Sequence, residues 1–456
     1  MPTTTPAIDR HAAIDWYRRN RQRSEAIFDL ISPDAYYSRP ISLRNPIVFY
    51  EGHLPAFSVI AFLRRGLGRP PVDARLEQLF ARGIDPESEA SAVPRSGART
   101  EWPARAEVQA FARACDEAIL DALSRDDLPT EGLYTALEHE AMHQETLLYM
   151  WHRLAYAQKR APWGQTPRRA DHSVASSRFE AAQPSTTVAP ERAVWGQTPI
   201  GIPAGIATLG ANRSDIPFGW DNEFDAHQVR VDAFDVDALP VTNAQFLEFV
   251  DAGGYHTRDL WDDEGWSWIH AEGVQHPAFW IPSAPRDWLW RGMFEEIPLP
   301  PDWPAYVSQA EASAYARWTQ RRLMTEAEFH RAAYGSPSGE RAQPWGDEPP
   351  DATRGHFDFA GFDPVAVGSH PAGASAWGVQ DLVGNGWEWT STIFGPFEGF
   401  SPMASYPEYS ADFFDGLHYV MKGASPATAK ELVRRSFRNW FRGNYPYVYA
   451  KFRTAR

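Results

Sequence analysis

Two histidines four residues apart are the first feature of this sequence that could do chemistry. They are His139 and His143, in the run LEHEAMHQE at residues 137–145. In an α-helix, residues i and i+4 lie one turn apart on the same face, so both imidazoles can reach one metal ion. A pair at this spacing also arises by chance in a chain with 14 histidines, so the spacing alone leaves a structural role open. The stretch predicts a helix that offers two ligands to a metal.

A third ligand has to come from elsewhere in the chain. Glu145 follows His143 by two residues, about 200° further round a helix, and is therefore expected to be a packing or supporting residue. His53 is the candidate third ligand, although a lone histidine beside an apolar stretch is more often structural. Pro55 follows shortly after it, and a proline predicts extended geometry for the preceding residue, Leu54.

Composition limits the class of protein. The chain has 456 residues, 43% apolar and 23% charged, which predicts a globular protein of two or three domains. A net charge of −15 argues against nucleic acid or an anionic membrane as a partner. The single cysteine, Cys115, excludes an intrachain disulfide and fits a reducing cytoplasm. No secretory signal is recognised at the N-terminus, and the apolar run from Ala56 to Leu63 is too short to span a bilayer.

The chain divides into two parts. Residues 1–158 are predicted to be all-α, with four helices near 12–31, 56–65, 103–123 and 133–155 that form a bundle. Residues 159–198 are rich in Pro, Ser, Thr, Ala and Arg, which predicts a linker; it contains the pentapeptide WGQTP twice, at 163–167 and 195–199. Residues 199–456 alternate short strands with a few helices and predict an α+β domain. Capping boxes at Ser308 and Thr325 each predict the start of a helix.

Four runs of the second part have the character of sequence motifs: PAYVS at 304–308, RLMTEAEF at 322–329, PWGD at 344–347 and GVQDLVGNGWEWT at 378–390. They match, in the same order, motifs of the formylglycine-generating-enzyme fold, which is C-type-lectin-like, so the second part resembles that family. Formylglycine-generating enzymes use a cysteine pair in this domain, and the domain here contains no cysteine. Their activity is therefore excluded, and the fold alone does not assign another.

The two parts together resemble the ergothioneine-type sulfoxide synthases, in which a DinB-like helical bundle precedes this fold. Those enzymes are mononuclear non-heme iron proteins with a distant histidine and a His-x3-His-x-Glu motif, which His53, His139, His143 and Glu145 match. The resemblance implies Fe(II) bound by the three histidines. It also implies that O2 is used to join a sulfur or selenium donor to the imidazole C2 of hercynine, Nα-trimethylhistidine.

A second motif indicates where hercynine would bind. The run SFRNW at 436–440 resembles the family's FRNW motif, whose Asn and Trp contact hercynine. Asn439 could hydrogen-bond the imidazole or carboxylate, and Trp440 could face the quaternary ammonium, although Trp440 could also be ordinary core. Met142, between the two helical histidines, is a further candidate substrate-binding residue.

Departures from the family pattern concern the donor. Enzymes that use γ-glutamylcysteine carry an Asp after FRNW and an Arg-rich segment between the first histidine and the histidine pair. This chain has Phe441 in place of the Asp, and Glu101 or Trp102 where the last Arg of that segment is expected. The loss of an Arg clamp and an Asp disfavours a charged dipeptide donor. We expect Phe441 and Trp102 to suit a neutral sugar, which points to the selenoneine synthase branch and its seleno- or thioglucose donor.

The proton donor is also altered. The family has two tyrosines before a PGF motif, and this chain has Phe394 and Phe397 in that stretch, which become candidate substrate-binding residues. Tyr445 and Tyr447 are the candidate catalytic substitutes, although such alternating aromatics are more often one face of a strand. Three other functions stay open: an ergothioneine synthase that uses γ-glutamylcysteine or cysteine, a hercynine-independent thiol oxidase, and a non-catalytic lectin-like binding protein. The sequence leaves the oligomeric state open.

Overall fold

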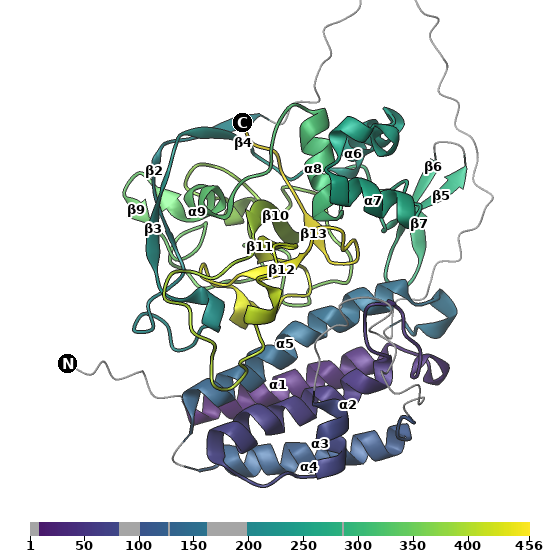
Figure 1. Ribbon diagram of the computed structural model, residues 1–456, viewed down its shortest axis with the longest axis vertical. Coiled ribbons are helices and arrows are strands. Elements are labelled where there is room, and N and C mark those ends of the chain that lie inside the picture. Colours follow the sequence, from purple (N-terminus) through teal and green to yellow (C-terminus); the bar gives the residue numbers. More distant parts are fainter. Residues whose placement is uncertain (1–8, 82–100, 126–127, 162–197, 285–286) are drawn as a thin grey trace, which may run out of the picture.

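The helical part and the α+β part form two layers of the molecule. The computed structural model describes residues 9–81, 101–125, 128–161, 198–284 and 287–456. Helices α1–α5 form one layer, and the chain from residue 198 onward forms the other (Figure 1). The predicted linker, with one complete WGQTP copy and most of the other, falls mainly outside the described residues. The predicted two-domain fold class, an all-α bundle followed by an α+β domain, is confirmed.

Long helices occur at all four places where the sequence predicts them. The structure adds a short helix, α3. The helical elements are α1 (Arg10–Asp29), α2 (Ile47–Ser58), which continues as a π-helix (Val59–Gly66), α3 (Ala74–Phe80), α4 (Arg105–Leu123) and α5 (Thr130–Arg153). Helix α2 packs against α3, α4 and α5, so it is the central helix of the bundle.

The prediction of extended geometry at Leu54 was wrong. Helix α2 passes through Leu54 and contains Pro55 in its interior. A proline inside a helix costs about 3 kcal/mol, because it removes one hydrogen bond and crowds the preceding turn. Nearly every residue of α2 is buried, and each large apolar side chain buried contributes about 1.5–3 kcal/mol. Burial therefore outweighs the local preference, and it places His53 on a rigid helix.

The continuous helix Ile47–Gly66 is 20 residues long and apolar enough to cross a membrane, with a mean hydropathy of 1.2 over an 18-residue window. Because 83% of that window is buried inside the protein, it has the character of a core helix. It is longer than the predicted 56–65 segment, because the helix begins at Ile47.

The second part is built around a four-stranded sheet in the order β12-β11-β10-β13. Antiparallel pairs join β10 to β11 and β11 to β12, whereas β10 and β13 are parallel. The strands of this sheet are β10 (Gly386–Ile393), β11 (His418–Ala424), β12 (Asn439–Arg442) and β13 (Ala450–Lys451). The sheet matters for function because β11 and β12 begin at the cavity described below.

Smaller sheets and four helices surround it. The strands are β1 (Pro199–Ile202), β2 (Gly205–Leu209), β3 (His227–Val231), β4 (Phe234–Asp237), β5 (Trp280–Ala284), β6 (Asp287–Arg291), β7 (Glu296–Pro298), β8 (Gly335–Ser336) and β9 (Gly339–Glu340). The helices are α6 (Asn243–Asp251), α7 (Asp263–Ala271), α8 (Gln309–Trp318) and α9 (Glu326–Tyr334). Both predicted capping boxes are confirmed, with Ser308 and Thr325 each accepting a hydrogen bond from the backbone N–H three residues on.

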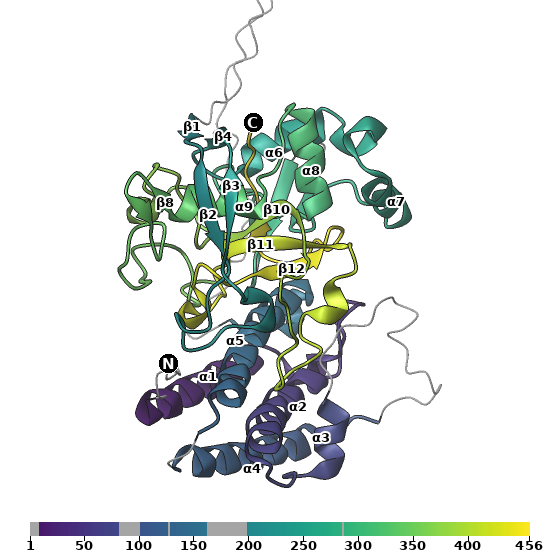
Figure 2. The same cartoon turned by 60° about the vertical axis from the view of Figure 1, so that its left-hand side comes forward.

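Helix α5 lies at the boundary of the two layers. It packs against α1 and α2 on one side, and the loops and strands of the C-terminal sheet lie along its other side (Figures 1 and 2). Side-chain hydrogen bonds cross the boundary along its whole length, from Glu131, which accepts from Ser405, to Arg153, which donates to the carbonyl of Ala278. The histidine pair therefore lies on the helix that both domains share.

Candidate metal centre and substrate cavity

Three histidines from two helices meet at this boundary. His53 comes from α2, and His139 and His143 come from consecutive turns of α5. One nitrogen from each ring lies within 4.8 Å of the other two, close enough for all three to bind one ion. His53 and His139 are buried and His143 is partly exposed, so the cluster is open on one side.

The hydrogen bonds of these rings leave ligand atoms unused. Nδ1 of His53 lies 2.7 Å from the carbonyl oxygen of Phe80 and therefore carries the proton, which leaves a lone pair on Nε2. That Nε2, both ring nitrogens of His139 and Nδ1 of His143 are buried without a hydrogen-bond partner among the described residues. Buried polar atoms are almost always paired, so this cluster of orphaned nitrogens fits a metal ion.

Burial also keeps the three rings neutral. It lowers the pKa of His53 to about 4, against the opposing effect of the Phe80 carbonyl. Burial lowers the pKa of His139 and of His143 well below the usual value, and neighbouring histidines add to the effect. Neutral imidazole is the form that binds metals, so no proton competes for these lone pairs near pH 7.

Aromatic rings hold two of the imidazoles in place. Phe57 stacks on His139 with ring centroids 3.4 Å apart and planes 10° apart. Phe49 stacks on His53 at 4.9 Å and 19°. Both phenylalanines lie on α2, so the helix that supplies one histidine also orients the other. Fixed rings reduce the entropy lost when an ion binds.

Glu145 has a different role from its neighbours. Its carboxylate accepts hydrogen bonds from Nε1 of Trp387 (2.7 Å) and Oγ1 of Thr428 (2.9 Å), both in the C-terminal domain. It is not part of the three-histidine group. The carboxylate therefore joins α5 to the second domain, as its helical angle predicts for a supporting residue.

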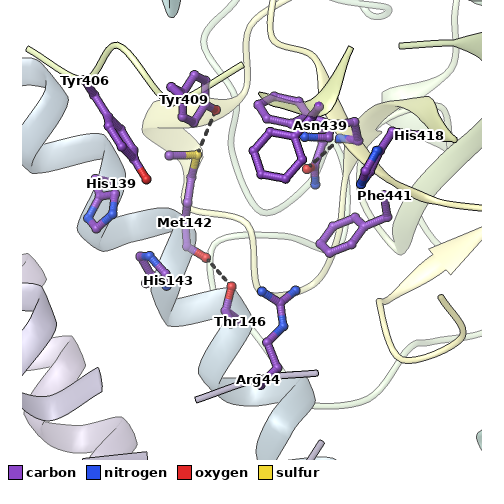
Figure 3. Close-up of a pocket in the computed structure, with 12 residues that line it drawn as sticks. Arg44, His139, Met142, His143, Thr146, Tyr406, Tyr409, His418, Asn439 and Phe441 are labelled. Atoms are coloured by element: carbon purple, nitrogen blue, oxygen red, sulfur yellow. Dashed lines mark hydrogen bonds between the residues drawn. The ribbon is translucent and has the colours of Figure 1, made fainter. Parts of the chain in front are cut away.

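A cavity of about 180 Å³ begins at His139 and His143. Both domains line it (Figure 3). The lining residues are Arg44, His139, Met142, His143, Thr146, Tyr406, Tyr409, Phe413, His418, Asn439, Trp440 and Phe441. The two histidines lie on one side, and Asn439, Phe441 and His418 lie across the space from them. A ligand in this cavity would contact the three-histidine cluster and the C-terminal domain at the same time.

Four of the predicted substrate-binding residues lie in this lining: Met142, Asn439, Trp440 and Phe441. Oδ1 of Asn439 accepts from the backbone N–H of Trp440 at 2.9 Å, so the amide N–H2 is the group that Asn439 can offer to a ligand. The predicted motif thus comes to the wall opposite the histidines.

The other predicted aromatic residues lie outside the lining. Phe394 stacks on Trp440 with ring centroids 4.2 Å apart, so it supports a wall residue from behind. Phe397 lies 4.1 Å from the guanidinium of Arg438. Trp102 packs against Phe49 and Phe80 in the helical bundle, each at 6.2 Å.

Neither of the two predicted catalytic tyrosines lines the cavity. Tyr445 is buried, and its hydroxyl accepts from Nε of Arg44 at 2.9 Å. Tyr447 packs edge-on against Tyr445 and lies near Arg153. The link through Arg44 makes Tyr445 a support for the lining, one residue removed from it.

Six lining residues were not predicted from the sequence: Arg44, Thr146, Tyr406, Tyr409, Phe413 and His418. The hydroxyl of Tyr406 points toward His139 in Figure 3, and the two rings are 6.0 Å apart. The hydroxyl of Tyr409 donates to Sδ of Met142 at 3.4 Å. For Tyr406 and Tyr409, the sequence signal was a pair of tyrosines three residues apart in the loop that precedes β11.

Three contacts from the helical domain hold the loop that carries Tyr406. The preceding residue, Ser405, donates its backbone N–H to Glu131 (2.8 Å) and exchanges a hydroxyl hydrogen bond with Thr135 (2.8 Å). Its carbonyl accepts from Arg65 at 2.6 Å. Every polar group of Ser405 is thus held by the other domain, which fixes where Tyr406 enters the cavity.

An ion network at the domain boundary fixes the part of the same loop that carries Tyr409. Arg434 donates two hydrogen bonds to the carboxylate of Glu138 on α5 and two to that of Glu223. Glu138 also accepts from Nε1 of Trp220 at 2.8 Å, and the Trp220 ring stacks on Tyr409 at 3.9 Å. The position of Tyr409 in the cavity wall therefore depends on α5.

Comparison with known proteins assigns the family. Residues 17–153 match the DinB superfamily, and residues 184–456 match the sulfatase-modifying factor enzyme 1-like domain. The chain is 34% identical to a hercynine oxygenase from Mycolicibacterium thermoresistibile, over 87% of this chain and 84% of that one. It belongs to the hercynine oxygenase family.

Two further relatives agree with this assignment. A hercynine oxygenase from Mycolicibacterium smegmatis is 33% identical over 87% of this chain and 88% of its own length. Ergothioneine biosynthesis protein 1 from Schizosaccharomyces pombe is 29% identical over 92% of this chain and 53% of its own length. The predicted resemblance to this family is confirmed, and the matches extend across both domains.

Proposed function

We propose that this protein is an Fe(II)- and O2-dependent enzyme that forms a C–S or C–Se bond at the imidazole C2 of hercynine. The observation that carries the proposal is a three-histidine cluster that opens into a cavity lined by Asn439 and Trp440, in a chain of the hercynine oxygenase family. His53, His139 and His143 would hold the iron, which supplies O2 activation and a site for a soft sulfur or selenium donor.

The reaction balances with O2 as the only oxidant. A thiol R–SH, the imidazole C2–H and O2 give a sulfoxide in which sulfur joins R to C2, and one water. The S–H and C–H bonds break, the C–S bond forms, and both protons leave in the water. The selenium reaction has the same stoichiometry and gives the selenoxide.

The lining residues have separate roles in this proposal. Asn439 donates its amide N–H to hercynine, and the Trp440 face attracts the quaternary ammonium, as aromatic faces do for alkylated ammonium groups. Tyr406 is the group that moves a proton, because it is the lining tyrosine whose hydroxyl points toward the histidine cluster. This replaces Tyr445 and Tyr447 as our candidate for that step.

For the donor we propose a seleno- or thiosugar. Phe441 lines the cavity with an apolar face, where a carboxylate would be needed to bind an amine. A second donor class, γ-glutamylcysteine or cysteine, is favoured by one observation: the guanidinium of Arg44 also lines the cavity and could pair with a carboxylate. A cytoplasmic location is proposed on the single cysteine, which is buried.

The test is anaerobic reconstitution with Fe(II), followed by hercynine, O2 and one donor at a time, with products identified by mass spectrometry. The donors are selenoglucose, 1-thioglucose, γ-glutamylcysteine and cysteine. A hercynine adduct with a sugar donor supports the preferred reading, and one with γ-glutamylcysteine or cysteine supports the second. O2 uptake with a thiol but without hercynine would identify a thiol oxidase. Hercynine binding without turnover of any donor would favour a binding protein.

A further inference from the structure

His418 is a lining residue of the cavity that the proposed chemistry does not yet use. It is the first residue of β11 and is 8% exposed. Its Nδ1 lies 2.9 Å from Oδ1 of Asp415. The ring lies across the cavity from His139 and His143, beside Asn439 and Phe441 (Figure 3). It therefore lies on the side of the space opposite the two histidines.

The contact with Asp415 determines what His418 can offer a ligand. A carboxylate accepts a hydrogen bond, so Nδ1 carries the proton and Nε2 has the lone pair. Burial lowers the pKa of His418, and the charge of Arg442 acts in the same direction, against the opposing effect of Asp415. The ring is thus neutral near pH 7, and Nε2 is the hydrogen-bond acceptor that this lining residue can offer to a ligand.

An acceptor at this place selects among ligand groups. Hercynine has one N–H, on the imidazole that must lie at the metal end, and its trimethylammonium and carboxylate have no proton to donate. An ammonium group on the second substrate would be opposed by Arg44, which lines the same cavity, and by Arg442, 3.9 Å from Asp415. A hydroxyl group is neutral and donates a hydrogen bond, so it meets neither objection.

We propose that His418, oriented by Asp415, is a specificity-determining residue that accepts a hydrogen bond from a hydroxyl of a sugar donor. Trp440 and Phe441, beside it in the lining, provide aromatic faces against which the C–H groups of a sugar can pack. The inference rests on the proposed function, because it names the donor class of that same site. Its test separates donor binding from hercynine turnover.

The experiment compares two variants with the wild-type protein. His418→Leu removes the acceptor, and His418→Gln is the matched control because its amide oxygen can occupy the place of Nε2. Binding of 1-thioglucose to the metal-loaded protein is measured by anaerobic calorimetry, and KM values for donor and hercynine are measured with O2. We expect His418→Leu to weaken thioglucose binding about tenfold, the value of one hydrogen bond, with hercynine KM unchanged and much of the loss restored in His418→Gln.

Deoxy analogues locate the hydroxyl. A series of 1-thioglucose analogues is used, each lacking one hydroxyl. One analogue should bind the wild-type protein about tenfold more weakly than 1-thioglucose does. The same analogue and 1-thioglucose should bind His418→Leu with equal affinity, because the hydrogen bond is already lost there. The inference is overturned if wild type fails to bind thioglucose, if His418→Leu binds it normally, or if the variant raises only the KM of hercynine. Turnover of hercynine with a simple thiol would leave the proposed function standing in each of these cases.

Discussion

Arg434 of the second domain pairs with Glu138 of α5 and with Glu223 of its own domain, and its replacement by Met tests how much this network stabilises the protein. One partly buried guanidinium, 16% exposed, faces two buried carboxylates, Glu138 and Glu223. Arg434→Met keeps an unbranched apolar side chain but leaves both carboxylates without their cation. Removing one partner of a buried ion pair costs about 3–5 kcal/mol, and here two pairs share the arginine. We expect a loss at or above the upper end of that range.

The neighbouring Arg435 is the matched control. Its ion pair with Glu340 is partly exposed, with both side chains 24% accessible, and such pairs contribute about 0–1 kcal/mol. Urea unfolding of Arg434→Met and Arg435→Met, followed by fluorescence, compares the two. Equal midpoints for the two variants would refute the argument that α5 is tied to the second domain by a buried ion network.

A second substitution tests the cause of the loss. Burial is the main reason that the pKa of Glu138 is raised to about 7, against the effect of Arg434, whereas the pKa of Glu223 is lowered. Glu223 has further donors, among them Ser436 at 2.6 Å. The buried negative charge of Glu138 is thus less well stabilised by its neighbours than that of Glu223. Adding Glu138→Gln to Arg434→Met removes this charge and should restore part of the lost stability. No recovery would mean that packing, and not the orphaned charge, causes the loss.

Three further predictions concern the site and one buried charge. His139→Ala should abolish stoichiometric iron binding, measured by metal analysis after gel filtration, while the exposed His270→Ala retains it. Tyr406→Phe should lower kcat for the hercynine adduct at least tenfold with little change in iron content or hercynine KM; unchanged kcat would exclude Tyr406 as the proton-moving group. Lys159→Met should raise stability at pH 7 by up to about 4 kcal/mol, because burial and Arg291 lower the pKa of Lys159 to about 7 from 10.5 unfolded, and each pKa unit corresponds to about 1.4 kcal/mol. The wild type regains this difference as pH rises from 7 to 10.5, so pH-independent unfolding midpoints for the pair would contradict the assignment.

The sequence predicted the elements better than it predicted how they meet. Helical periodicity identified the four long helices, and His-x3-His spacing identified two members of the metal cluster, because both patterns are local. His53 was only a candidate ligand, because no local pattern placed it on a helix. Pro55 predicted extended geometry beside it, whereas the tertiary burial of α2 overrides that local effect. Spacing along the chain cannot show that α2 brings His53 to α5.

The cavity wall was harder to predict, because loops of the second domain build much of it. Tyr406 reaches the site through the three contacts of Ser405 with the helical domain, which no local pattern encodes. Trp102 was expected beside the donor from its place in the sequence, yet it packs within the bundle against Phe49 and Phe80. The alignment of Trp102 with a donor-binding segment of the family therefore did not predict that Trp102 lines the cavity.

Helix α5 nevertheless carried one signal of its position that can be understood in physical terms. An amphipathic surface helix buries one stripe, but α5 buries residues on all sides, three glutamates among them: Glu138, Glu140 and Glu145. Buried carboxylates require donors, and these three find them in different places. Glu140 pairs with Arg21 of α1, whereas Glu138 and Glu145 bind Arg434 and Trp387 of the other domain. The buried acidic residues on several faces of α5 thus find partners in both domains, and the three-histidine cluster to which α5 contributes lies between those domains.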